Sequence, residues 1–176
     1  VLGWYDEANP EVVDWQIKWA VEHGIRFFMV DWYWAAGNRH LEHWLEAYRR
    51  ARYRPYLKWC MMWANHNRPG THSLEDMETV AQFWVENYFS MPEYYRIDGR
   101  PVVILWSPNN LRRDLGGSNS VRQGLDIART VARKAGFEGI FFIAMKFPET
   151  STDPALLRTL QRESYEMTSI YHYMGH

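Results

Sequence analysis

Polar side chains stand where two apolar runs of the sequence end. Asp31 follows the run FFMV, and the stretch MWANHNRPGTH places Asn65, His66 and Asn67 directly after Trp63 and Ala64. A carboxylate next to such a run is costly to bury unless it has a partner or a task. Amides and an imidazole supply both donors and acceptors, which suits ligands rich in hydroxyl groups.

Each of these residues also has a structural interpretation. Asp31 can form an ion pair with Arg39 or Lys58, and the two amides can bond the loop backbone before Pro69 and Gly70. The sequence leaves these alternatives open.

Aromatic residues are abundant, with 10 Trp, 11 Tyr and 8 Phe. Many must be core, because large rings dominate burial. Several nevertheless fall next to the polar groups, and flat rings rimmed by short polar side chains describe a carbohydrate site better than a phosphate or acyl site. We therefore predict a set of substrate-binding residues: Trp32, Trp34, Trp63, Asn65, Asn67, Trp106, Lys146 and His172.

Hydrophobic periodicity predicts helices that alternate with strands. Asn9 and Pro10 have the types expected of an N-cap and a first helical residue, Ser73 is a second predicted N-cap, and Asp153 with Pro154 opens a third helix. Strand 26–34 is expected to be buried on both faces, and a polar loop with Gly37 and Asn38 to follow it. The predicted helices begin near residues 10, 41, 73, 118 and 154, and the predicted strands are 26–34, 56–63, 101–106, 139–145 and 167–173.

This α/β alternation predicts parallel strands joined by right-handed crossovers. No GxGxxG loop follows a strand, so a (β/α)8 TIM barrel is favoured over a nucleotide-binding open sheet. A complete barrel takes about 250 residues. With about five βα units, residues 1–176 are expected to form one incomplete barrel domain, a fragment that lacks the first strand and the last units.

A barrel active site lies at the C-terminal ends of the strands. Cleavage of a glycosidic bond normally needs two carboxyl groups. This edge offers Asp31 as the strongest acidic candidate and Glu7 as the second, with His66 beside them, and we predict these three as catalytic residues. Strand parity limits the prediction, because Asp31 and Trp32 point to opposite faces. The other acidic candidates are Asp6, Asp114 and Glu149.

Composition argues against several partners. The 20 basic and 21 acidic residues give a net charge of -1, which is not the footprint of a nucleic-acid-binding protein. No apolar run is long enough for a membrane span. Cys60 is interpreted as a buried small hydrophobe, His40 and His43 as a solvated helix face, and Glu75 and Asp76 as helix-start charges. No metal or cofactor is expected, and the oligomeric state and compartment stay open.

Four motifs, PEVVDWQIKWAVEHGI, VDWYW, MWANHN and YYRIDGRPVVI, together resemble the glycoside hydrolase family 99-like domains and the related WbsX-like glycosyltransferases of surface polysaccharide loci. The resemblance covers roughly residues 3–173. It implies a metal-independent (β/α)8 barrel that cleaves α-mannosidic linkages with retention, using two carboxylates. That pair matches no motif in this chain, and His66 stands where the WbsX-like branch usually carries Glu.

The leading expectation is therefore a carbohydrate-active enzyme, a glycoside hydrolase that acts on a polysaccharide or glycan. Glycosyl transfer in polysaccharide assembly and glycan binding without catalysis are the alternatives.

Overall fold

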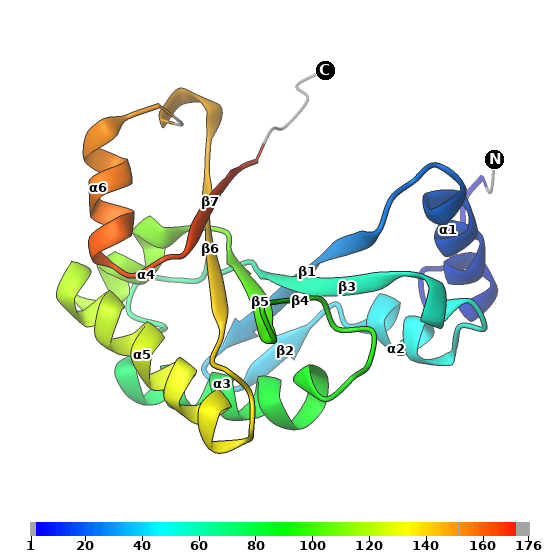
Figure 1. Ribbon diagram of the computed structural model, residues 1–176, viewed down its shortest axis with the longest axis horizontal. Coiled ribbons are helices and arrows are strands. Elements are labelled where there is room, and N and C mark those ends of the chain that lie inside the picture. Colours follow the sequence, from blue (N-terminus) through cyan, green and yellow to red (C-terminus); the bar gives the residue numbers. More distant parts are fainter. Residues whose placement is uncertain (1–2, 151, 172–176) are drawn as a thin grey trace.

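Five strands run parallel in one sheet, in the order β1, β3, β5, β6, β7 (Figure 1). The computed structural model describes residues 3–150 and 152–171. Together with the helices between them, these strands form part of a (β/α)8 barrel, which confirms the predicted architecture. The strands are β1 Phe27–Ala35, β3 Lys58–Trp63, β5 Arg100–Leu105, β6 Phe141–Lys146 and β7 Met167–Ile170.

Helices α3 and α5 lie along one side of the sheet, whereas α1 and α6 stand at opposite ends of the row of strands (Figure 1). Within the described ranges, none of the helices is both long and apolar enough to cross a membrane. The helices are α1 Pro10–Glu22, α2 His43–Arg50, α3 Leu74–Trp84, α4 Pro108–Leu115, α5 Ser118–Lys134 and α6 Pro154–Arg162, with shorter turns η1 Arg54–Tyr56, η2 Val85–Phe89 and η3 Pro148–Thr150.

The predicted helix starts are confirmed by their caps. The Asn9 side chain accepts a hydrogen bond from the Glu11 amide at 3.0 Å, and Asp153 accepts one from the Ala155 amide at 2.8 Å. Ser73 accepts one from the Asp76 amide at 3.0 Å. Each cap satisfies an N–H group that has no partner inside the helix.

Three elements were not predicted: β2 Asn38–His40, β4 Arg96–Ile97 and helix α4. The polar loop expected at Gly37 is instead a two-residue turn, because Ala35 pairs with Asn38 in an antiparallel hairpin. Ala36 and Gly37 both have positive φ, 47° and 92°, as the hairpin turn that matches strand twist requires.

The register of the strands separates two faces of the sheet. We call the face against which α3 packs the helix face, and the opposite face the inner face. On the inner face the row Asp31, Met62, Ile104, Ile143, Met167 crosses the sheet, and one residue further the helix face carries the row Trp32, Trp63, Leu105, Ala144, Thr168.

Strand β1 differs from the prediction that both its faces are buried. Phe27 and Met29 on its inner face are 38% and 37% exposed. The reason is its place in the sheet, since over Phe27–Trp32 it pairs with β3 alone and β2 joins it only at its end. Strand β3 lies between β1 and β5, and its inner residues Cys60 and Met62 are buried, as predicted for Cys60.

Candidate functional site

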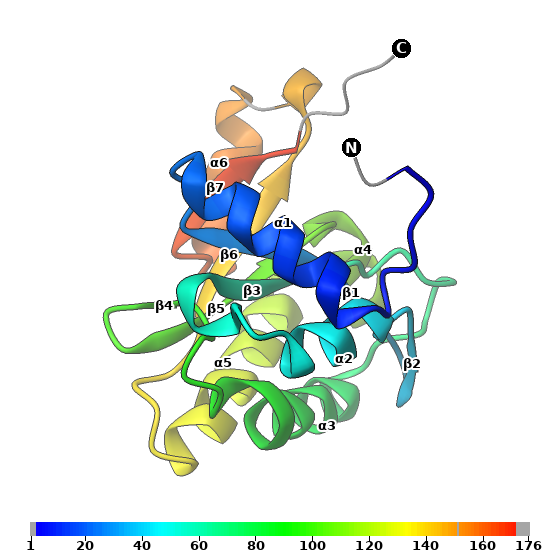
Figure 2. The same cartoon turned by 90° about the vertical axis from the view of Figure 1, so that its right-hand side faces the viewer.

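An open hollow of about 670 Å³ lies along the free edge of β1. Seen from that end of the sheet, α1 lies in front of the edge with α2 beside it (Figure 2). The hollow brings together Asp31 and Glu7, the two carboxylates predicted as catalytic. Its lining consists of Glu7, Gln16, Phe28, Met29, Val30, Asp31, Tyr33, Leu41, His43 and Trp44.

Glu7 is held in the hollow by a residue that was not predicted to belong to the site. Its carboxylate oxygen Oε2 lies 3.1 Å from Nε2 of His43, in the first turn of α2. The His43 side chain is partly exposed on α2 as interpreted, and the contact with Glu7 adds a partner, whereas His40 lies in β2 and not on a helix face as expected. No local pattern links residues 36 positions apart, so only the fold reveals the pair.

Asp31 has no structural ion pair among the described residues. Arg39 binds Glu42 at 2.6 Å instead, and Lys58 Nζ points to the Pro92 carbonyl at 3.5 Å. Partial burial raises the pKa of the Asp31 carboxyl, and the opposite charge of His66 acts to lower it. Asp31 is therefore a carboxyl group at an open hollow that is easier to protonate than an ordinary aspartate.

His66 faces this same part of β1. Its exposed ring meets the Tyr33 ring edge to face, with centroids 5.6 Å apart and planes at 84°. Tyr33 lines the hollow, as Asp31 does. The structure thus places Asp31 and Glu7 in the hollow along β1, and His66 beside Tyr33 near the end of that strand.

The side chains of Asn65 and Asn67, on either side of His66, bond backbone groups of the protein and not a ligand as predicted. Asn65 is fully buried, and its side chain donates to the Ser107 carbonyl at 2.9 Å and accepts from the Ser107 amide at 2.8 Å. Asn67 Nδ2 donates to the Trp34 carbonyl at 2.7 Å. The amides fix the loop, as the alternative interpretation held, and Asn65 is inaccessible to a ligand in this structure.

Three of the predicted aromatic platforms are core residues. Trp32, Trp34 and Trp63 lie on the helix face and are 2%, 4% and 0% exposed. The Trp32 indole donates to Glu42 and to the Tyr88 hydroxyl, each at 3.0 Å. A sugar ring cannot stack on indoles buried in this way, so the structure corrects the substrate-binding role predicted for these three.

Trp106 is placed as the prediction requires, at the end of β5 and half-buried. Its ring meets Phe147 and Tyr171 edge to face, with centroids 5.3 Å and 4.3 Å away. These two rings were not predicted, because they become neighbours only when β5, β6 and β7 lie side by side. Lys146 ends β6 and is 7% exposed, and His172 lies outside the described residues.

The other acidic candidates are engaged elsewhere. Asp114 accepts hydrogen bonds from Arg113 at 2.8 Å and from the Gly70 amide at 3.0 Å. Burial alone would raise the pKa of Asp114, but these bonds and one from the His72 amide lower it. Asp6 accepts from the Ala8 amide at 2.9 Å, and the Glu149 side chain lies outside the described part of the chain.

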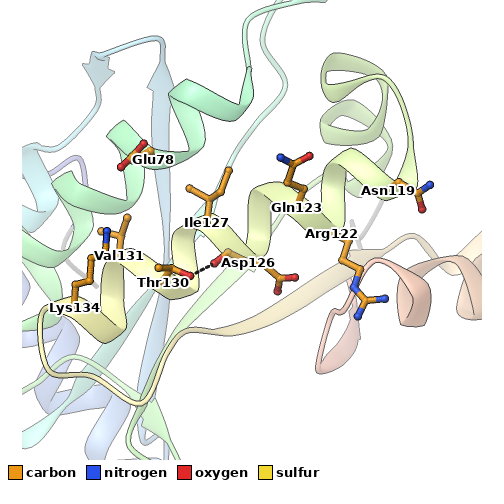
Figure 3. A pocket seen from close by; sticks show the side chains of 9 residues that line it. All are labelled: Glu78, Asn119, Arg122, Gln123, Asp126, Ile127, Thr130, Val131 and Lys134. Atoms are coloured by element: carbon orange, nitrogen blue, oxygen red, sulfur yellow. Dashed lines mark hydrogen bonds between the residues drawn. The ribbon is translucent and has the colours of Figure 1, made fainter.

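A second groove, of about 520 Å³, runs along the outer surface of α5 (Figure 3). Its side chains come from the solvent side of α5 and from Glu78 of α3, and Asp126 pairs with Arg129 at 2.9 Å. No imidazole lines it, and it lies away from the strand ends. In residues 3–150 and 152–171, no cluster of three or more His, Cys, Asp or Glu side chains is arranged to hold a metal ion. The β1 hollow is therefore the candidate site.

Sequence comparison relates the chain to one protein family and to a curated bacterial protein. The model of the family described as Glycosyltransferase WbsX matches residues 1–170. A curated relative, "Uncharacterized protein WxcX" of Xanthomonas campestris pv. campestris strain B100, is 26% identical over 189 residues, covering 92% of this chain and 26% of that protein.

Solved structures share the fold. The GH99 endo-alpha-mannosidase from Bacteroides thetaiotaomicron has a TM-score of 0.61 at 20% identity, covering 97% of this chain and 46% of that chain. A "Glycoside hydrolase-like protein" has a TM-score of 0.64 at 21% identity, covering 99% of this chain and 53% of that chain. The chain thus spans about half the length of these structures and about a quarter of the curated relative.

Proposed function

The chain belongs to the WbsX glycosyltransferase family, and from that premise we propose that it is a carbohydrate-active domain whose full protein hydrolyses glycosidic bonds. The observation that carries this proposal is the β1 hollow, in which Asp31 and Glu7 occur together with His43, beside His66. The hollow runs along β1 from Phe28 to Tyr33, and its Asp31 and Tyr33 lie toward the C-terminal end of the strand, where a barrel carries its active site.

Asp31 is proposed as the proton-bearing group of the site. Its pKa is raised by partial burial, which is the direction that a general acid requires. The proton passes to the glycosidic oxygen as the bond to the anomeric carbon breaks, water supplies the hydroxyl group to that carbon, and the remaining proton of this water returns to the carboxylate of Asp31. Glu7, bonded to His43, supplies the second carboxylate near the developing positive charge of the ring.

The proposed substrate is a glycan with α-linked mannose. This choice rests on the similarity of fold to the GH99 endo-alpha-mannosidase, whose name states that linkage. His66 and Tyr33 offer polar groups for hydroxyls at one end of the inner face, and Trp106 with its neighbours Phe147 and Tyr171 offers an aromatic surface along the same edge of the sheet.

Glycosyl transfer is the second candidate, because the family description names a glycosyltransferase. A transferase would bind its sugar in the same hydroxyl-binding site and would also use an activated donor. It differs from a hydrolase in consuming a nucleotide sugar or a lipid-linked sugar.

The test compares both reactions in the full-length protein. Each variant is incubated with α-linked manno-oligosaccharides, with release of reducing ends as the measurement, and separately with nucleotide sugars, with donor consumption as the measurement. We expect reducing ends from the wild type and a loss of about 10²–10⁴-fold in Asp31→Asn, the usual contribution of a general acid.

Asp126→Asn is the matched control, because it makes the same chemical change in the α5 groove. It is expected to retain the wild-type rate. Unchanged hydrolysis in Asp31→Asn would remove Asp31 from catalysis. Donor consumption without hydrolysis would establish the transferase, and glycan binding without either reaction would establish a binding domain.

A further inference from the structure

A closed ring of hydrogen bonds lies behind the loop that carries His66. It begins at the Trp34 indole, whose Nε1 donates to Asp76 Oδ1 at 2.8 Å, and Asp76 Oδ2 lies 2.9 Å from His72 Nδ1. His72 Nε2 lies 3.2 Å from Asn67 Nδ2, which also donates to the Trp34 carbonyl at 2.7 Å. The ring therefore starts and ends at Trp34.

The hydrogen bonds at the two ring nitrogens of His72 fix its tautomer. The Trp34 carbonyl accepts only, so the Asn67 amide must present Nδ2, and His72 Nε2 must then accept. The acceptor pair on Asp76 receives the Trp34 indole proton and the His72 Nδ1 proton. The contacts of Asn67 with Nε2 and of Asp76 with Nδ1 both require the tautomer that carries its proton on Nδ1. A carboxylate orients an imidazole in the same way in other sites.

Because the ring is buried, a hydrogen-bond donor or acceptor without a matching partner would be costly there. His72 is 2% exposed and Asp76 is 9% exposed, and the His72 ring meets the Trp63 ring at 4.9 Å with planes at 78°. The ring plane is therefore held by packing, while the proton position is held by hydrogen bonds. In such a place an unmatched donor or acceptor costs more than one exposed to water.

Asp76 lies in the first turn of α3, as the sequence predicted, but it is buried and makes side-chain bonds that the prediction did not include. Its neighbour Glu75 fits the description of a helix-start charge, since it is exposed. Asp76 points into the protein instead, and the spacing of four residues from His72 is the signal that was overlooked.

We propose that this ring, from Asp76 through His72 to Asn67, is a positioning device that holds His66 against Tyr33 at the β1 hollow. His66 lies between two clamped amides, Asn65 on Ser107 and Asn67 on the Trp34 carbonyl, so its backbone is fixed on both sides. Asp76 and His72 are positioning residues, because they act on the site through Asn67. The proposal uses the site of the proposed function, but its structural content does not depend on which reaction occurs there.

Asp76→Asn is the sharpest variant, since it keeps the volume and removes the acceptor pair. If the new amide accepts from the Trp34 indole, its NH₂ group faces His72 Nδ1. The imidazole proton must then move to Nε2, where it meets Asn67 Nδ2, donor against donor. Asn67 leaves the Trp34 carbonyl as a result. An aspartate that orients a catalytic histidine elsewhere behaves in this way when it is replaced by Asn.

The experiment uses full-length protein with ¹⁵N-labelled histidine. The ¹⁵N shifts of His72 report the tautomer, and the nuclear Overhauser effect between the His66 and Tyr33 rings reports the position of His66. We expect Asp76→Asn to move the His72 proton from Nδ1 to Nε2 and to abolish the His66–Tyr33 effect. Glu75→Gln is the matched control, with the same loss of charge in the same helical turn, and should leave both signals unchanged.

Asn67→Leu keeps the proposal testable if Asp76→Asn does not fold. It leaves Asp76 and His72 in place, so the Nδ1 tautomer should persist while the His66–Tyr33 effect is lost. Retention of that effect in Asn67→Leu, or an equal loss in Glu75→Gln, would overturn the proposal. These readouts are independent of hydrolysis, so they separate its failure from that of the proposed function.

Discussion

Asp31 and Asp114 are two carboxylates in the βα units of one sheet, yet their surroundings shift their pKa values in opposite directions. At Asp114 two backbone amides and Arg113 converge, and its pKa is lowered. At Asp31 no ion pair forms among the described residues, the carboxyl faces the β1 hollow and its pKa is raised. The half between β3 and β5 holds Asp114 with its own polar groups, whereas in the β1 half Asp31 is exposed at the hollow.

The largest effect that can test this contrast concerns packing. Trp63→Ala on β3 removes a fully buried indole, and we expect it to lower the free energy of unfolding by about 3–5 kcal/mol. Met29→Ala on β1, at a position 37% exposed, should cost less than about 1 kcal/mol. Urea unfolding of the two variants measures the difference. Equal losses would show that the two halves are packed alike.

A second comparison uses the two carboxylates directly. Asp114→Asn removes the charge from a buried side chain that accepts bonds from Arg113 and two backbone amides, so we expect it to lower the free energy of unfolding by about 1–2 kcal/mol at neutral pH. Asp31→Asn should leave stability at neutral pH unchanged or slightly raised, because an uncharged side chain relieves the partial burial of the carboxylate.

The pH dependence of the two variants should differ in sign. The lowered pKa of Asp114 adds stability above 3.8, the ordinary value, and this is lost as pH falls through the folded-state pKa. The raised pKa of Asp31 adds stability below 3.8, and this is lost as pH rises through the folded-state pKa. Unfolding measured from about pH 2 to pH 7 distinguishes them. A stabilising contribution from Asp31 above its pKa would contradict the contrast.

The sequence was sufficient to predict the order of strands and helices, because apolar periodicity and caps such as Asn9 and Ser73 act locally. It was not sufficient for the burial of β1, whose run RFFMVDWYW is as apolar as that of β3. Burial depends on which strands lie on each side, and that is a property of the sheet. The same limit explains why the three buried indoles were predicted to bind substrate. The alternation of side chains along a strand shows that Asp31 and Trp32 point to opposite faces, but only the fold shows which face packs against α3.

The candidate site was predicted in part. Asp31 and His66 were chosen from their places at the ends of apolar runs and Glu7 from the opening loop, and the structure places Asp31 and Glu7 in the β1 hollow and His66 beside Tyr33. His43 and the Trp34–Asp76 bond were missed, because hydrogen bonds between residues 36 or 42 positions apart leave no local pattern. The spacing of four between His72 and Asp76 was a local signal of the ring that the interpretation of Asp76 as a helix-start charge left unused. The amides at 65 and 67 show the converse error, in which side chains suited to bind a ligand bind the protein's own backbone.

The most direct test of the β1 hollow as the glycan site is hydrogen–deuterium exchange of the full-length protein with and without an α-linked manno-oligosaccharide. A bound glycan slows exchange of the backbone amides it covers. We predict slower exchange over residues 29–33 and 65–67 and no change over residues 119–134, which form the α5 groove. Protection over 119–134 with none over 29–33 would contradict the account.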